Sequence, residues 1–300
     1  MTGQADNALS GLLTQYLAGW GPISWRQELA SARLSQDANL ARAVLSLSAI
    51  ETDSRIIYRK LHVANLDRRQ AIHEFNISWL AEEAEHGRAL RYLAGKLGLR
   101  EAPPDRTARA SVRSAFAWPS LAAARVLGSA LEATYLTLGA LQEYVALTTY
   151  RKLAELLDDP NAALVLRRIA AQEGRHLHFY RGAALVFLEE PWHAFVASRL
   201  LRFLWRPPGI DLLGQAAWLN AFGPLLDHAD YRSRLLRMDQ LVRQMPGFAG
   251  LHLMEDFLSH HGYPVADAPS PARPDETLNV PSPRKAADPA SGTGHLTTSS

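Results

Sequence analysis

The sequence predicts an all-α fold, in which four long helices form a bundle and further helices flank it. Two long segments, 68–97 and 161–190, place apolar residues at alternating spacings of four and three, the pattern of a helix seam that faces a bundle core. Prolines and glycines separate such segments, as expected at helix ends. The alternation of apolar and polar residues that is typical of a half-buried strand does not appear convincingly anywhere.

The chain divides into four predicted regions. Residues 1–36 form an N-terminal helical segment that Trp20-Gly21-Pro22 interrupts, and residues 37–190 form the bundle. The expected bundle helices are 37–62, 68–97, 119–157 and 161–190, with a linker at 101–118. Residues 191–263 supply additional helices: one from Pro191 to the Pro207-Pro208-Gly209 break, then two or three short ones over 210–261. Because large apolar residues nearly vanish from 264–300, we expect that segment to be a disordered tail.

The composition excludes several classes of protein. The formal charge of +2 without a block of like charges argues against nucleic-acid binding. The absence of cysteine excludes disulfides, cysteine-ligated clusters and thiol catalysis. No secretory signal pattern and no apolar run long enough for a membrane span occur, so we expect a cytoplasmic protein.

Each of the two seams contains a Glu-x-x-His motif. Glu83 and His86 lie in the first, and Glu173 and His176 lie in the second. Positions three residues apart share one face of a helix, so each carboxylate and imidazole point the same way. One such match alone is weak, because a solvated helix face explains it equally well.

Two lone glutamates strengthen the pattern. Glu51 precedes the turn at Asn65 by fourteen positions, and Glu83 follows the same turn at Asp67 by sixteen. Similarly, Glu143 precedes Asp158 by fifteen positions, and Glu173 follows Pro160 by thirteen. At ~1.5 Å per residue, a mismatch of two positions displaces a group by only ~3 Å. The six side chains are therefore expected at one level of the bundle.

Their charge predicts what they bind. Four carboxylates on apolar seams are costly to bury, and no Lys or Arg lies near them on these seams. Two divalent cations would balance the four negative charges. Glutamate and histidine ligands in a bundle favour iron, with manganese as the alternative, and this is the ligand set of ferritin-like two-metal carboxylate proteins.

Three stretches within residues 37–190 resemble the soluble acyl-carrier-protein desaturases. The stretch Trp79 to Gly87, WLAEEAEHG, is similar to that family's Trp-x-Ala-Glu-Glu-x-x-His-Gly motif. The stretch Ile169 to His176, followed by Tyr180, is similar to the second motif, and Gln142-Glu143 to a third. The N-terminal segment and the region beyond 190 resemble the family weakly.

The resemblance implies six metal ligands: Glu51, Glu83, His86, Glu143, Glu173 and His176. The sequence around Glu51 departs from the family, and Asp53 is an alternative ligand that lies out of seam register. Glu82 is an alternative to Glu83, although both motifs favour the three-residue spacing. The residues expected beside the ligands are Trp79, Ala146, Gln172 and Tyr180.

Two departures from the family concern the reaction rather than metal binding. Gln172 stands where the family has an Asp that is thought to deliver electrons, and Ala146 stands where the family has a Thr near bound dioxygen. These replacements remove a charge and a hydroxyl. They favour, as alternatives to desaturation, a related hydroxylase or N-oxygenase.

By resemblance, the expected function is oxygen-dependent introduction of a double bond into a fatty acyl chain carried by acyl carrier protein. The implied partners are that carrier, dioxygen and an external electron donor such as ferredoxin, and the implied assembly is a homodimer. A non-catalytic, ferritin-like iron-binding protein is a further alternative. The candidates for a groove that holds the chain are Gly139, Ala140, Ala146 and Leu147, and those for a basic docking patch are Arg68-Arg69, Arg151-Lys152 and Arg167-Arg168.

Overall fold

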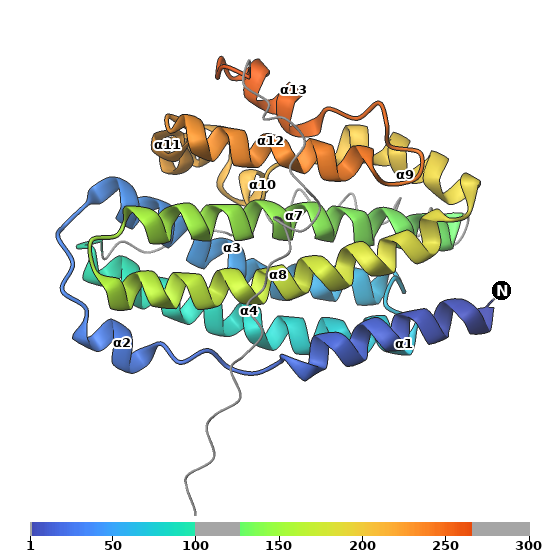
Figure 1. The fold of residues 1–300 in the computed structure, drawn as a ribbon, viewed down its shortest axis with the longest axis horizontal. Helices are drawn as coiled ribbons and strands as arrows, with labels where there is room; N and C mark the ends of the chain where they lie inside the picture. The colour runs from blue at the N-terminus through green and yellow to red at the C-terminus, as the bar shows by residue number, and fades with distance from the viewer. Residues whose placement is uncertain (1, 100–126, 266–300) are drawn as a thin grey trace, which may run out of the picture.

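The four longest helices of the structure lie side by side as a bundle (Figure 1). They are α3 (Ala38–Val63), α4 (Gln70–Lys96), α7 (Ser129–Leu156) and α8 (Pro160–Leu188). This computed structural model describes residues 2–99 and 127–265, and those residues contain helices and no strand. The predicted all-α bundle is therefore confirmed.

The predicted seams form the bundle core. All eight residues of the α4 seam are buried, and so are all eight residues of the α8 seam. They are Ile72, Asn76, Trp79, Glu83, His86, Leu90, Leu93 and Leu97 in the first, and Ala162, Leu166, Ile169, Glu173, His176, Tyr180, Ala183 and Phe187 in the second. The alternating spacing thus identified the inward face of both helices.

A glycine allows α7 and α8 to approach closely. A Cβ atom added to Gly139 of α7 would lie 2.6 Å from Cδ1 of Tyr180 on α8, a distance that would force the ring to move. The missing side chain therefore makes room for the buried Tyr180 ring, which packs against Trp79 at 6.2 Å between ring centroids.

Aspartates begin two of the bundle helices. The carboxylate of Asp37 accepts hydrogen bonds from the backbone N–H groups of Asn39 and Leu40 at the start of α3. Asp159 does the same for Asn161 and Ala162 at the start of α8, and its second oxygen accepts from the N–H of Arg33 at 2.8 Å. These bonds satisfy N–H groups that a helix leaves unpaired at its first turn.

Replacing Asp159 by Ala is expected to lower the free energy of unfolding by ~1–2 kcal/mol, because three backbone donors lose their acceptor. Urea denaturation of the metal-free protein measures this. Asp159→Asn keeps an acceptor oxygen and should restore most of the stability. The neighbouring exposed Asp158 is the matched control, and D158A should change stability by less than ~0.5 kcal/mol. Equal losses in D159A and D158A would contradict this interpretation.

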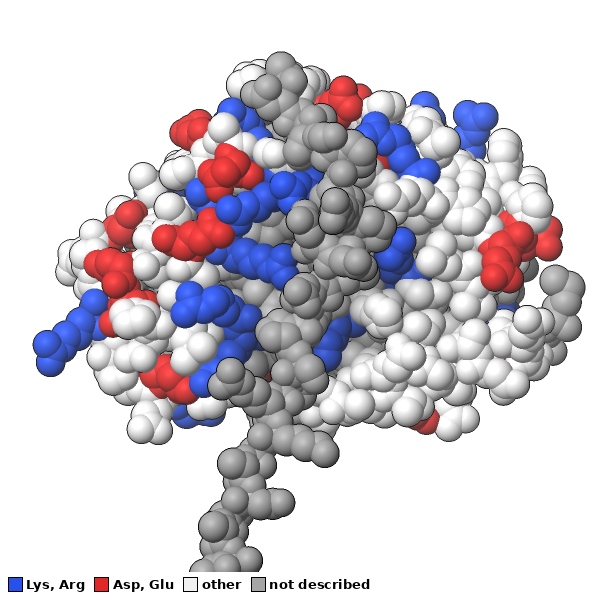
Figure 2. All heavy atoms as spheres, viewed as in Figure 1, with Lys and Arg blue, Asp and Glu red and all other residues white. Residues whose placement is uncertain are grey.

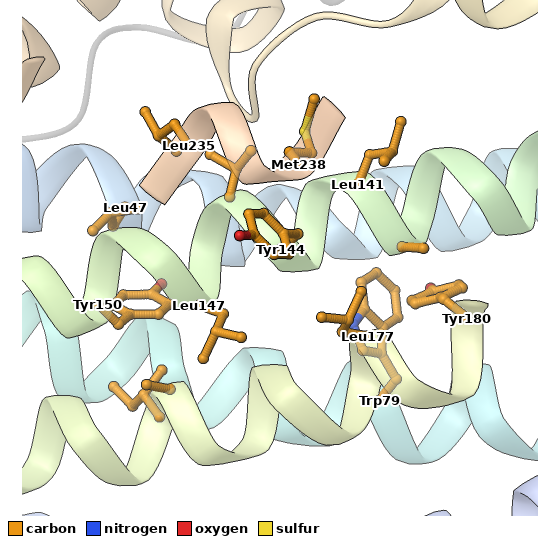
Figure 3. Packing of buried hydrophobic residues seen from close by; sticks show 14 of the residues in the cluster. Leu47, Trp79, Leu141, Tyr144, Leu147, Tyr150, Leu177, Tyr180, Leu235 and Met238 are labelled. Carbon is orange, nitrogen blue, oxygen red and sulfur yellow. The ribbon is translucent and has the colours of Figure 1, made fainter. Parts of the chain in front are cut away.

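Additional helices cover the bundle. Near the N-terminus, α1 (Thr2–Ala18) lies along α4 and α8, followed by α2 (Arg26–Ser31) (Figure 1). After the bundle, α9 (Pro191–Leu204), α10 (Ile210–Leu213), α11 (Gln215–Leu226), α12 (Ala229–Arg243) and α13 (Leu253–His260) follow in order. Figure 3 shows Tyr144 of α7 beside Leu235 and Met238 of α12. Its hydroxyl donates to the Arg234 carbonyl at 3.0 Å, which ties this layer to the bundle.

Several predicted boundaries differ from the structure. Residues 210–261 contain four helices rather than two or three, because the four-residue α10 is set off by glycines with positive φ at 209 and 214. The helix expected over 119–157 begins at Ser129 and ends at Leu156, since Gly128 adopts φ +50°. The predicted linker, residues 119–126 and the tail from 266 onward lie outside the described residues. Within the described part, no helix is both long and apolar enough to cross a membrane.

Candidate metal centre

Six buried side chains from the four bundle helices converge at one level of the core. They form two groups that could each hold a metal ion. The first contains Glu51, Glu83, His86 and Glu173, and the second contains Glu83, Glu143, Glu173 and His176. In each group the candidate ligand atoms lie within 4.8 Å of one another. Glu83 and Glu173 belong to both groups, so the two candidate positions are adjacent.

Both histidines turn Nδ1 toward the carboxylates. Nδ1 of His86 lies 3.0 Å from Glu173 Oε1. Nδ1 of His176 lies 2.9 Å from Glu173 Oε2 and 3.3 Å from Glu83 Oε1. The two motifs thus place equivalent atoms of the two imidazoles on opposite oxygens of one glutamate.

Several of these atoms make no well-aligned hydrogen bond. Glu83 Oε1, Glu173 Oε1 and His86 Nδ1 are buried and lie near an oppositely charged partner, but none of them makes a hydrogen bond of acceptable geometry. Within the described residues, the ion pairs of Glu83, Glu143 and Glu173 are made with the two histidines, and none is made with Lys or Arg. Buried polar atoms are normally satisfied, so three orphaned atoms that converge on one space indicate a missing ligand.

Without cations the carboxylates destabilise one another. Burial, followed by the charges of Glu51 and Glu173, raises the pKa of Glu83 well above its ordinary value. Burial and then the charge of Glu173 raise the pKa of Glu143 in the same way. Burial also raises the pKa of Glu51, whose carboxylate accepts a hydrogen bond from Tyr150. Bound cations would remove this cost by favouring the ionised forms.

Glu173 behaves differently because it lies between the imidazoles. Burial opposes its ionisation, but His86 and His176 together lower its pKa. Burial likewise opposes the charged form of His176, and the surrounding glutamates raise its pKa well above the ordinary value. The same opposition holds for His86, where the charge of Glu173 prevails over burial and raises the pKa. Glu173 is therefore the most strongly ionised member of the set.

A second layer of hydrogen bonds holds both imidazoles through Nε2. Nε2 of His176 lies 2.8 Å from Glu82 Oε2, and Nε2 of His86 lies 2.7 Å from Gln172 Oε1. The Gln172 amide in turn donates to Glu82 Oε1 at 2.8 Å. A carboxylate or amide on the outer nitrogen orients the ring and leaves Nδ1 available as a metal ligand.

The N-terminal segment completes this layer, which the sequence pattern did not reveal. The Tyr16 hydroxyl of α1 donates to Glu82 Oε2 at 2.7 Å, and the Gly21 carbonyl accepts from the Gln172 amide at 2.6 Å. Arg175 also contacts Glu82, at 3.0 Å. A buried hydroxyl such as Tyr16 carries no local motif, so only the packing of α1 on α4 and α8 could identify it.

The structure decides between the alternatives left by the sequence. Glu51 belongs to the first group, whereas Asp53 does not. Glu83 lies among the converging carboxylates, whereas Glu82 lies on the outer side of His176. Glu82 accepts a hydrogen bond from the Gln172 amide, so a carboxylate lies directly beside Gln172.

The other residues expected beside the ligands differ in their contacts. The Trp79 indole donates to Glu143 Oε1 at 3.0 Å, so it lies where the sequence predicted. The Tyr180 hydroxyl instead forms a hydrogen bond of 3.2 Å with the Tyr135 hydroxyl. Its ring packs against Trp79, and both residues are labelled in Figure 3. Ala146 is partly buried and offers no polar group. Among the described residues, the Trp79 indole donates a hydrogen bond to Glu143, and no tyrosine or threonine hydroxyl does so.

An apolar cavity reaches the candidate centre from one side. Its volume is about 460 Å³, and Glu143, Trp79 and Tyr180 form part of its wall. Along α7 the wall extends from Glu143 back to Leu131, twelve residues or ~18 Å. The facing wall comes from the second half of α3, including Ile50, Ile57 and Leu61. An elongated apolar molecule would fit this shape with one part beside Glu143.

Of the predicted groove residues, only Gly139 lines this cavity. Ala140 and Leu147 are buried elsewhere in the bundle core, so their small or apolar side chains serve helix packing. Gln142 lines the cavity as well and donates to the Arg206 carbonyl at 2.8 Å, which fixes the loop after α9 over it.

The predicted basic patch is largely occupied by internal ion pairs. Arg68 pairs with Glu132, Arg69 with Asp6, Lys152 with Asp230 and Arg168 with Glu28. On the face shown in Figure 2, basic and acidic side chains are interspersed. These four cations therefore stabilise contacts between helices and are poor candidates for a docking surface.

Comparison of the chain with protein-family models, with curated proteins and with solved structures finds no match.

Proposed function

We propose that the chain is a di-iron, oxygen-dependent oxidoreductase that acts on a fatty acyl chain, introducing a double bond. The observation that carries this proposal is the pairing of two adjacent, buried ligand groups with an apolar cavity that reaches Glu143. The orphaned atoms of Glu83, His86 and Glu173 fit a pair of cations. The motif resemblance supports iron over manganese and an acyl substrate over other apolar molecules.

The six residues have distinct roles in this proposal. Glu83 and Glu173, which belong to both groups, would contribute to holding both ions, while Glu51 with His86 and Glu143 with His176 would each contribute to holding one. When bound, reduced iron supplies the two-electron activation of dioxygen that removal of hydrogen from an unactivated carbon requires. Glu82 and Gln172 orient the two imidazoles, and Trp79 holds Glu143.

The cavity would position the substrate and exclude water from the centre. Its apolar wall would orient a saturated chain by burial alone, so that one carbon lies beside Glu143. Two exposed cations, Lys60 and Arg206, line the same cavity. Asp53 and Asp211 line it as well, so the lining carries charges of both signs and does not by itself mark a docking surface for the acidic carrier protein.

Iron analysis followed by mass spectrometry of the products tests the proposal. Iron-loaded protein with a ferredoxin reducing system, dioxygen and C18 or C16 acyl carrier protein is expected to bind two irons and to form a product lighter by two hydrogens. Absence of iron, or of any oxidised acyl product under these conditions, would refute it.

A hydroxylase is the second candidate, which Gln172 and Ala146 favour because both depart from the desaturase pattern. The same experiment separates the two, since hydroxylation adds one oxygen atom to the substrate. Iron oxidation with no change in any acyl substrate would instead indicate an iron-binding protein, for which the apolar cavity has no evident use.

Replacing Glu82 by Gln should weaken iron binding without removing a ligand. The neutral amide cannot stabilise the His176 ring as the carboxylate does, and removal of such outer partners typically costs ~10–100-fold in metal affinity. Competition with a chelator measures the affinity. Arg175→Gln, which contacts Glu82 but neither imidazole, is the comparison and should have a smaller effect. Unchanged affinity in E82Q would contradict this role.

A further inference from the structure

A second cluster of potential metal ligands lies at the turn between α3 and α4. His62 near the end of α3 and His73 in α4 both direct Nδ1 at one oxygen of Asp67, which lies in the turn. The distances to Asp67 Oδ2 are 3.0 Å from His62 and 2.9 Å from His73. The sequence alone favours ordinary surface or hydrogen-bonded roles for both histidines. His62 lies five residues before Asp67, and His73 lies six residues after it. These nearly equal distances from the turn place the two histidines at a similar depth in the helical hairpin, and the sequence could have shown this.

The cluster combines a fixed carboxylate with accessible imidazoles. Only 3% of the Asp67 side chain is exposed, against 61% of His62 and 38% of His73. Within the described residues, its ion-pair partners are these two histidines, with no Lys or Arg. Asn65, with φ +55°, makes the tight turn that brings the two helix ends together. The carboxylate is therefore buried in the turn, while the more exposed imidazole rings are accessible to water and ions.

We propose that His62, Asp67 and His73 bind one divalent transition-metal ion of the zinc or copper(II) class. Two imidazoles and one carboxylate suit such ions, whereas magnesium and calcium prefer oxygen ligands alone. The three candidate atoms lie within 4.8 Å of one another, and ligand bonds of ~2.0–2.2 Å require only small side-chain movements from there. To bind the ion through Nδ1, each neutral imidazole only has to carry its proton on Nε2 instead of Nδ1. Metal binding at the two rings therefore neither takes up nor releases a proton.

This site is independent of the bundle centre. It shares no residue with either buried group, and His73 precedes Glu83 by ten residues of α4, which corresponds to ~15 Å. Leu61, Ala64 and Leu66 of the same turn line the apolar cavity. A bound ion would join the end of α3 to the start of α4 and so hold this part of the cavity wall.

Zinc titration of the tag-free, iron-loaded full chain tests the proposal. Calorimetry is expected to show one zinc ion bound per chain, with the iron content unchanged before and after. Since loss of an outer partner already costs ~10–100-fold, loss of a ligand in His62→Ala should weaken zinc binding by at least about tenfold. His252→Ala is the matched control, because His252 forms an exposed pair with a single carboxylate, Glu255, at 2.8 Å.

Copper(II) supplies a second readout. Its electron paramagnetic resonance spectrum should show coupling to two nitrogens in the wild type and in H252A, and to one nitrogen in H62A and in His73→Ala. Absence of zinc uptake, or equal affinity in H62A and H252A, would overturn the proposal. If the bundle bound no iron and took up zinc instead, one zinc site would still be at least about tenfold weaker in H62A than in H252A. The comparison of H62A with H252A therefore tests this site whether or not the bundle binds two irons.

Discussion

Glu83→Gln is expected to abolish iron binding and oxidation of the acyl chain while leaving the metal-free fold intact. Glu83 belongs to both ligand groups, so an amide there weakens both metal positions at once. Its pKa is raised well above the ordinary value by burial and by the charges of Glu51 and Glu173. Burial and the neighbouring charges thus favour the protonated form of this side chain in the metal-free protein, and Gln imitates that form in size and charge.

The measurements are iron per chain, product formation and the free energy of unfolding without metal. For the metal-free protein, E83Q and the wild type should agree within about 0.5 kcal/mol. Iron should then raise the melting temperature of the wild type alone, because only a state that binds the ligand is stabilised by it. Glu85→Gln is the control two residues away, where the carboxylate contacts Trp25 and Arg88 instead. Full iron loading of E83Q would contradict the proposal that Glu83 contributes to holding both ions.

The sequence predicted the centre well because its signal is periodic. Glu83 and His86 share a seam with Ile72 and Leu90, and a helix of constant pitch carries that register over many residues without help from the rest of the fold. Matched distances from two turns then placed Glu51 and Glu143 at the same depth. Both inferences need only the regular geometry of a helix and a count of residues from a turn, and both can be obtained from the sequence.

The outer layer was not predictable in this way. Tyr16 and the Gly21 carbonyl reach Glu82 and Gln172 through the packing of separate segments, and nothing in their local sequence marks that contact. The same applies to Arg206, whose backbone carbonyl accepts a hydrogen bond from the Gln142 side chain. The helix expected over 119–157 is interrupted at Gly128 for a local reason, since this glycine adopts a positive φ that the helical pattern around it conceals; residues 119–126 lie outside the described part.

Leu138→Trp is expected to stop conversion of the acyl substrate without loss of iron. Leu138 lines the apolar cavity five residues before Glu143, ~7.5 Å along α7, so a larger ring there fills space in the part of the cavity closer to Glu143 than to Leu131. Displacing a substrate by about 1 Å can cost ~100-fold in rate, and kcat/KM should fall by at least that much. Product formation and iron content are measured on the same sample.

The position of the introduced tryptophan in the cavity should determine which acyl chain lengths are no longer oxidised. Leu131 lines the same cavity twelve residues before Glu143, or ~18 Å along α7. Leu131→Trp should therefore spare short acyl chains and reject the longest ones, whereas L138W rejects all of them. Ile77→Trp, at a position that is 51% exposed on α4, controls for the indole itself and should change neither iron content nor product. If L138W and I77W oxidised every chain length alike, the substrate would have to reach the centre by another route, and the cavity would lose its assigned role.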